Sequence, residues 1–281
     1  MTQLPSRVPR LVVRARASCC SASFISRKSA AIASMIVLAV LLAVPAGAGQ
    51  VATSSLPKAE DVLKRYRDAI GGEEAIRKHS ARRFKGVYEI PAQGMRGDLL
   101  ILAAAPNLMR LSITLPGLGE MQRGFDGRIG WSVDPAIGPR LLEGRELDEL
   151  RHSADFYDDL HDPTRFSSVT VVGKPMFEGQ PCYEIKLVRE SGFEYTEYFN
   201  AETGLLAGVK MNASSQMGSI PVTTVVSEYK VFGGVLTPTI TRQKMMGLES
   251  VTTISSVDFG PIDPKEFALP PPIEALAAHK K

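Results

Sequence analysis

The clearest pattern along the chain lies between residues 97 and 135, where short stretches of alternating apolar and polar residues are separated by turns. From Met109 to Leu115 the odd-numbered positions are apolar, and the even-numbered positions from Arg110 to Thr114 are polar. This alternation is typical of a strand with one buried and one solvated face. It predicts strands at residues 98–103, 108–115, 121–125 and 128–133, with Asp126-Gly127 as a strong hairpin signal.

Similar alternation continues through the second half of the chain. With the four strands above, it gives about twelve strands at roughly ten-residue spacing, which favours an all-antiparallel sandwich or barrel over βαβ units. The further strands are predicted at residues 83–90, 168–173, 182–189, 194–200, 205–211, 221–231, 237–246 and 250–259.

Helical spacing of apolar residues precedes the strands. Residues 58–70 carry apolar positions at i, i+3, i+4 and i+7 and end at Gly71-Gly72, and a shorter helix is predicted at 73–79. A further helix is predicted around residues 145–156. The segments 270–272 and 275–281 are predicted to form a frayed tail.

The N-terminus has the layout of an export signal. The first 29 residues contain six basic residues and no acidic one, and an apolar run at 30–44 is followed by the cleavage pattern Ala46-Gly47-Ala48. The run is short for a membrane span of about 20 residues. We therefore expect residues 1–48 to be a signal peptide, 49–269 one periplasmic domain and 270–281 a tail. The alternative is anchoring to the inner membrane by an uncleaved segment.

Removal of this leader changes the charge balance. The chain has 33 basic and 30 acidic residues, and cleavage leaves 27 basic residues against the same 30 acids, a net charge of −3. The sequence thus gives no basic cluster of the kind that binds nucleic acid. Cys182 is then the single cysteine, so no intramolecular disulfide is expected, and we expect a monomer.

Candidate chemistry is concentrated in one segment. His152, Asp155 and His161 are weak candidates for a metal site, since imidazole and carboxylate are common ligands, and His152, Asp155 and Asp159 would share a face of a helix. The alternative is that this segment forms a solvated helix followed by a capped turn. In that case the same residues are a charge cluster on the surface. No known catalytic or nucleotide-binding motif occurs, so we expect neither catalysis nor a cofactor.

The ordered features of the first region are Gly97-Asp98-Leu99, Pro106-Asn107 with Arg110, Pro116, Asp126-Gly127, Trp131 and Pro135. This order resembles the LolA/LolB family of periplasmic lipoprotein carriers. The resemblance implies a mainly β (α+β) fold of about 10–12 strands, with a strongly curved antiparallel sheet or incomplete barrel and helices covering its concave face. It also implies an apolar cavity for a lipid, an acyl chain or a lipoprotein, and a membrane-protein donor or acceptor as a possible partner.

The predicted cavity combines the apolar face of the 108–115 strand with the first helix. Trp131 is interpreted either as a wall of this cavity or as a core anchor. The candidate lipid-binding residues are Met109, Leu111, Ile113, Leu115, Trp131, Val62, Leu63 and Tyr66. The family's carriers use a charged residue near this strand to control lid closure, and the resemblance assigns that role to Arg110.

The sequence and this resemblance thus predict a periplasmic carrier of a lipid, an acyl chain or a lipoprotein, and the resemblance implies a role in sorting outer-membrane lipoproteins. Two other classes stay open. One is a non-enzymatic envelope sensor or interaction module of the same fold, and the other is a metal-dependent enzyme at His152 and His161.

Overall fold

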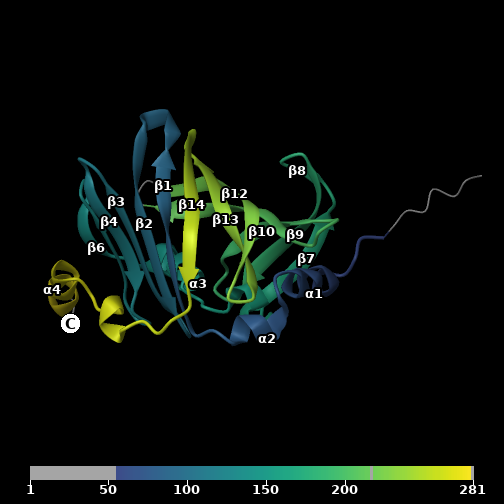
Figure 1. The fold of residues 1–281 in the computed structure, drawn as a ribbon, viewed down its shortest axis with the longest axis horizontal. Helices are drawn as coiled ribbons and strands as arrows, with labels where there is room; N and C mark the ends of the chain where they lie inside the picture. The colour runs from purple at the N-terminus through teal and green to yellow at the C-terminus, as the bar shows by residue number, and fades with distance from the viewer. Residues whose placement is uncertain (1–54, 216–217, 280–281) are drawn as a thin grey trace, which may run out of the picture. The chain divides into compact units, whose positions relative to one another are not determined.

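A computed structural model describes residues 55–215 and 218–279 of the chain. Fourteen strands in these two ranges form an antiparallel sheet in the order β6-β5-β4-β3-β2-β1-β14-β13-β12-β11-β10-β9-β7, with β8 paired to β9 alone (Figure 1). The predicted fold class, a mainly β protein with an antiparallel sheet and few helices, is confirmed. The strong curvature of the sheet stays a prediction, and the predicted leader lies outside the described residues.

The strands vary from two to fifteen residues in length. Their bounds are β1 Ala81–Ile90, β2 Met95–Ala104, β3 Leu108–Leu115, β4 Gly119–Phe125, β5 Gly130–Asp134, β6 Gly138–Leu141, β7 Phe166–Gly173, β8 Met176–Phe177, β9 Gln180–Arg189, β10 Glu194–Asn200, β11 Leu206–Ser215, β12 Gly218–Phe232, β13 Val235–Met245 and β14 Leu248–Asp258.

The helices lie before, between and after the strands. The α-helices are α1 Ala59–Ala69, α2 Gly72–Arg77, α3 Gly144–Ser153 and α4 Pro271–His279, and the 3₁₀ turns are η1 Pro91–Gln93, η2 Asp158–Leu160, η3 Pro163–Arg165 and η4 Pro264–Phe267. No helix in the described part of the chain has both the length and the hydrophobicity needed to cross a bilayer.

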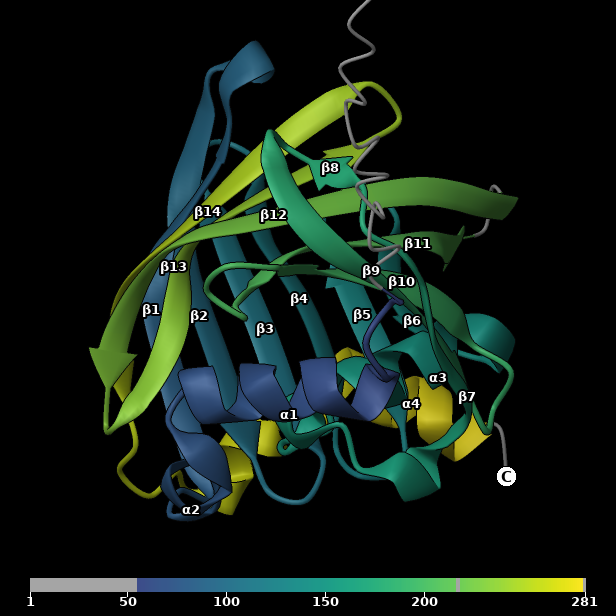
Figure 2. The same cartoon turned by 90° about the vertical axis from the view of Figure 1, so that its right-hand side faces the viewer.

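The α1 helix forms where the apolar spacing predicts it. Acidic residues occupy its first turn and a basic residue its last, as the helix dipole favours. Val62, Leu63 and Tyr66 form its buried face and pack with residues of β7, β9 and β10. The helix ends at Ala69, two residues before Gly71, whose φ of 122° and close approach to the Gly234 carbonyl leave no room for a side chain. From there the chain enters α2 beside the start of β1 (Figure 2).

The two faces of β3 are covered by different parts of the chain. Cross-strand partners share a face of a sheet, and the register places Arg110, Gly124, Trp131 and Leu141 in one row. On this face η4 contacts β3, and α4 contacts β6, beside which it lies in Figure 1. On the opposite face, Met109 packs with residues of α3.

The C-terminal segment is therefore not the frayed tail that the sequence predicted. Residues 271–279 form α4, and Ile273 is fully buried. A run of prolines suggested a break, but proline is well tolerated in the first turn of a helix. The sequence also missed β6 and β8, which have only four and two residues.

Candidate functional site

A cavity of about 470 Å³ lies between α3 and η2 on one side and strands β10 to β13 on the other. One wall comes from β11, β12 and β13 and is mainly apolar, with Thr224 and Gln243 as its polar residues. Its apolar residues are Leu206, Val209, Met211, Ala213, Val222 and Met245. The other walls are charged or aromatic, with Tyr66, Arg123, Glu149, His152, Asp158, Asp159, His161, Phe193, Tyr195 and Glu197.

The charged residues near η2 come together because α3 ends at Ser153 and not at residue 156 as predicted. Asp155 is buried just beyond the helix, where its carboxylate accepts a hydrogen bond from the Tyr157 amide and pairs with Arg165. Burial raises the pKa of the Asp155 carboxyl, and the Arg165 charge opposes that effect. The segment is thus partly buried and ion-paired, and the expected solvated helix with a surface charge cluster is wrong.

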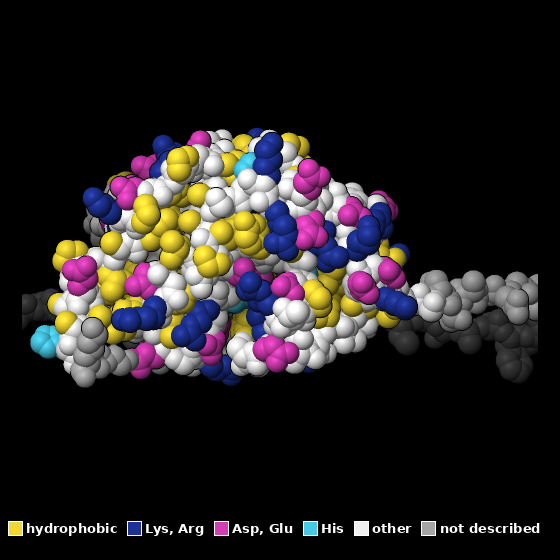
Figure 3. Space-filling model, turned by 90° about the horizontal axis from the view of Figure 1, so that it is seen from below, with side chains coloured by type: hydrophobic (Ala, Val, Ile, Leu, Met, Phe, Trp, Pro, Cys, Tyr) yellow, Lys and Arg dark blue, Asp and Glu magenta, His cyan; other side chains and the backbone are white. Residues whose placement is uncertain are grey.

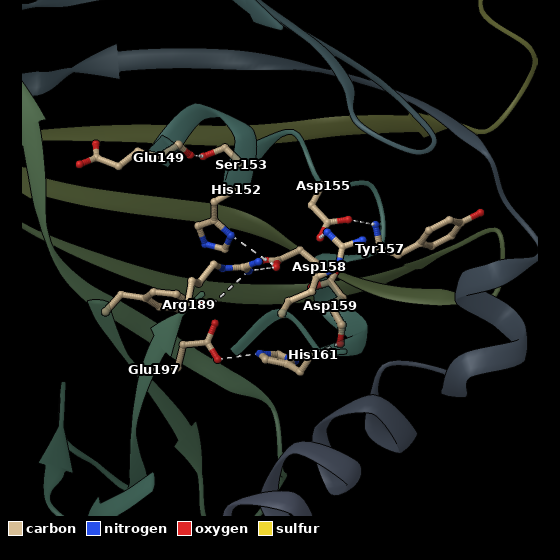
Figure 4. Close-up of polar contacts among 12 residues, drawn as sticks. Glu149, His152, Ser153, Asp155, Tyr157, Asp158, Asp159, His161, Arg189 and Glu197 are labelled. Atoms are coloured by element: carbon tan, nitrogen blue, oxygen red, sulfur yellow. Dashed lines mark hydrogen bonds and ion pairs between the residues drawn. The ribbon is translucent and has the colours of Figure 1, made fainter. Parts of the chain in front are cut away.

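Two ion-pair groups form the polar wall (Figure 4). The His161 Nε2 lies 2.8 Å from Glu197 Oε2, and the side chains are only 4% and 9% exposed. The Asp158 carboxylate pairs with Arg189 and lies 3.4 Å from His152 Nδ1. Each acid in these groups therefore has a basic partner.

The titration of these groups follows from their partners. Burial opposes a charge on His161, but the charge and hydrogen bond of Glu197 outweigh it and raise the His161 pKa to about 9. Burial also disfavours ionised Asp158, yet His152 and Arg189 hold its pKa well below the usual range. Burial, together with the Asp159 charge, raises the pKa of Tyr66, whose hydroxyl donates to Asp159 at 2.8 Å. At neutral pH His161 and Asp158 are therefore charged, whereas Tyr66 keeps its proton.

The other charged group lies near the α3 end of the cavity. Arg140 donates two hydrogen bonds to the Glu146 carboxylate, at 2.6 and 2.9 Å. The Glu149 carboxylate accepts from the Ser214 amide at 2.8 and 3.1 Å, which joins α3 to β11. Arg123 lines the cavity beside them, and its only hydrogen bond within the described ranges is a 3.5 Å contact with the Glu146 carbonyl.

The structure brings only part of the predicted site together. Tyr66, His152 and His161 line the cavity, but Val62 and Leu63 lie in the core beneath α1. The β3 residues are divided between other clusters. Ile113 and Leu115 pack with β2 and β14, with Leu111 beside them, and Met109 packs against α3. The predicted packing of α1 on the β3 face does not occur.

Two further candidates lie away from the cavity. Trp131 is 1% exposed and belongs to the opposite face of the sheet from Met109, in the row with Arg110. Of the two interpretations of Trp131, the placement favours the core anchor. Arg110 donates to the Glu266 carbonyl and to Gln122, so it contacts η4. Its assigned role in lid control stays a prediction.

The three weak metal candidates are separated by their partners. His152 faces Asp158, Asp155 pairs with Arg165, and His161 pairs with Glu197. Within residues 55–215 and 218–279, no group of three or more His, Cys, Asp or Glu side chains is arranged to hold a metal ion.

Sequence reasoning missed Arg123, Glu149, Glu197 and the β11–β13 wall. One signal was available for Glu197, an acid in a strand otherwise rich in aromatic residues. The alternation identified strand faces, but it did not show which faces of distant strands meet.

The comparisons with known proteins place this architecture in the LolA-like class of folds. No family model matches the sequence, and no curated protein matches it either. A LolA superfamily protein from Nitrosomonas europaea is similar in structure, with 14% identity, a TM-score of 0.50 and coverage of 76% of this chain and 99% of that one. A DUF1329 family protein from Desulfovibrio piger matches with 11% identity, a TM-score of 0.52 and coverage of 75% and 97%.

A third similar structure is an outer membrane lipoprotein-sorting protein domain from Vibrio parahaemolyticus. It has 11% identity, a TM-score of 0.49 and coverage of 74% and 97%. At these identities the likeness to the first two structures shows the fold alone.

Proposed function

We propose that this chain is a non-catalytic carrier of the bacterial periplasm that binds the apolar chain of a lipid or lipoprotein. The observation that supports this most directly is the cavity of about 470 Å³ with one mainly apolar wall and, opposite it, charged and aromatic side chains. Ligand pockets span roughly 300–1,000 Å³ and combine apolar surface with a few polar groups. An amphiphile matches this division, because its chain covers the apolar wall and its head group faces the charges.

The LolA-like fold supports a carrier-like role, and the export pattern of residues 1–48 supports the periplasm. Removal of apolar surface from water stabilises a complex by about 25 cal/mol per Å². Leu206, Val209 and Met211 offer such surface on neighbouring positions of β11. An acyl chain laid along β11 to β13 would gain this contribution.

Ligand-dependent stability tests the proposal. The protein, purified without detergent, is examined by native mass spectrometry and then by thermal unfolding with fatty acids, phospholipids and lipopeptides. A ligand at about a hundred times its Kd should add about 2.7 kcal/mol to the free energy of unfolding. If no member of the panel moves the melting curve, the carrier proposal is wrong.

A matched pair of variants locates the binding. Ala213→Phe fills the cavity from β11, whereas Asn212→Phe places the same side chain on the exposed neighbour. Because adjacent strand residues face opposite sides, only A213F should abolish the ligand-induced shift. Equal shifts in both variants would contradict binding in this cavity.

The second candidate is a sensor or interaction module of the same fold. The turn between β13 and β14 favours it, since Met246 is 62% exposed and its neighbours Met245 and Leu248 are also exposed. Exposed apolar surface of this kind marks interaction sites. Failure of the ligand panel would leave this candidate as the better one.

A further inference from the structure

Arg123 lines the cavity without an ion-pair partner among the described residues, and His152 Nδ1 is the other lining nitrogen that lacks a hydrogen bond there. The Arg123 side chain is part-buried, and its Nε is a buried donor with no hydrogen-bond partner among the described residues. A guanidinium has five N–H donors. The 3.5 Å contact of Nη2 with the Glu146 carbonyl uses one of them poorly.

The nearby carboxylates do not form an ion pair with Arg123 because both are engaged elsewhere. Glu146 is held by the two hydrogen bonds from Arg140, and Glu149 receives the Ser214 amide on both oxygens. Their charges still favour the cationic form, but burial has the larger effect and lowers the Arg123 pKa. An incompletely paired cation away from water is costly.

The acids of the opposite wall are also unavailable. Glu197 pairs with His161, and Asp158 pairs with Arg189. Asp159 accepts from the Tyr66 hydroxyl and lies 3.7 Å from Arg82. Among the described residues, Arg123 is thus the one arginine or lysine that lines the cavity, and its guanidinium has hydrogen-bond donors left for a ligand.

We propose that Arg123 is the anchor for an anionic head group, a carboxylate or a phosphate, of the amphiphile whose chain covers the β11–β13 wall. This assignment rests on the proposed function and names the ligand class. The planar guanidinium matches carboxylate and phosphate oxygens and can form two parallel hydrogen bonds with either. A neutral or cationic head group would leave the donors of Arg123 unmatched.

The test uses four amphiphiles that share one alkyl chain and differ in the head group: a carboxylate, a monophosphate, an alcohol and an amine. Kd values are measured below micelle formation for the parent protein. The carboxylate and the phosphate should bind about tenfold more tightly than the alcohol. The reason is that a hydrogen bond from the guanidinium to a charged oxygen stabilises the complex more than one to a neutral hydroxyl oxygen does. The amine should bind most weakly.

Variants then assign the preference to one residue. Arg123→Gln should weaken the two anionic ligands about tenfold and leave the alcohol unchanged, and Arg123→Lys should retain part of the preference. Arg128→Gln, in the exposed turn after β4, is the matched control and should change nothing. Circular dichroism and melting temperature establish whether each variant is folded. If R123Q does not fold, the comparison of R123K with the parent protein still tests the assignment.

The outcomes separate the two proposals. If all four amphiphiles bind with equal affinity, or if R123Q keeps the anionic preference, the Arg123 assignment is wrong and the carrier proposal stands. If none of them binds, both proposals fail. Inorganic phosphate and acetate complete the series. Binding of these small anions through Arg123 as tightly as the long-chain ligands would overturn the assignment to a lipid head group.

Discussion

The two charged ends of the cavity contain the same kinds of residue but balance them differently. Near η2, the buried His161–Glu197 pair and the Asp158–Arg189 pair each bring opposite charges together. Near α3, the acids are held by Arg140 and by the Ser214 amide, and Arg123 forms no ion pair with any carboxylate in the described part of the chain. The first arrangement stabilises the fold without a ligand, whereas the second leaves binding capacity unused. A buried charge that already belongs to an ion pair is therefore a weaker sign of a binding site than one that does not.

Mixed charges also cover one outer face of the molecule. On the face shown in Figure 3, Lys and Arg side chains alternate with Asp and Glu, and hydrophobic side chains lie between them. This face presents no broad field of one sign, which agrees with the near balance of charge in the sequence. Selectivity between ligands would then depend on the interior of the cavity.

The largest expected effect comes from removing the anion of the balanced end. Glu197→Gln leaves His161 buried without its partner and should lower the free energy of unfolding by about 3 kcal/mol. This loss is at the lower end of the range for breaking a buried ion pair. The imidazole of His161 can release its proton, so the variant need not keep an unpaired charge in its interior. The control Glu194→Gln breaks an exposed pair with Lys186 and should cost less than about 1 kcal/mol. Equal losses in urea denaturation would refute the distinction.

The same pair predicts a pH dependence. The folded-state pKa of His161, about 9, lies above its ordinary value of 6.5. Its stabilising contribution should be complete below pH 6.5 and lost as the pH rises through about 9, on the order of 3 kcal/mol in all. Burial raises the pKa values of Tyr66 and Tyr195, so these phenols do not titrate in that window.

Urea denaturation between pH 6 and 10, compared with His161→Gln, measures this contribution. The difference in unfolding free energy between parent and variant should shrink across the window. A difference that stays constant with pH would show that the buried imidazole is neutral throughout.

Two arginines give a direct comparison of the ends. Arg189→Met removes a partner of Asp158 and should cost about 2 kcal/mol, reduced by the partial exposure of that carboxylate. Arg123→Met removes a cation without an ion-pair partner and should change the stability of the ligand-free protein by less than about 1 kcal/mol, or raise it. A loss in R123M as large as that in R189M would mean that Arg123 is a structural residue.

The smallest effect is expected at the surface. Lys64 and Asp68 form an exposed pair one turn apart on α1. Lys64→Ala should cost only about 0.3 kcal/mol, and added salt should reduce that difference further. Thermal unfolding of this variant defines the baseline against which the buried pairs are judged.

The fold was largely predictable because its signals are local. Alternation and turn residues located twelve of the strands, and β3 has the predicted bounds of Leu108–Leu115. The shortest strands were missed because two to four residues are too few for a period to show. The helix α4 was missed because Ile273 is its only buried residue.

The site was less predictable because its contacts are distant in sequence. His161 and Glu197 are 36 residues apart, and Tyr66 and Asp159 are 93 apart. Alternation predicted that Met109 and Arg110 lie on opposite faces of β3, but not that α3 covers one face and η4 contacts the other. Arg123 and Ser214 approach the same helix from strands on distant parts of the sheet, which no local pattern records.

The position of Trp131 has a practical consequence for spectroscopy. It is the single tryptophan of the chain, is almost completely buried, and lies on the face of β5 opposite the Met109 side of the sheet, in the row contacted by the C-terminal segment. Its ring packs against Gly124 and does not line the cavity. Intrinsic fluorescence should therefore respond to detachment of the C-terminal segment and to global unfolding. It should stay silent when a non-fluorescent ligand enters the cavity, so binding assays on this protein need an extrinsic dye or a label.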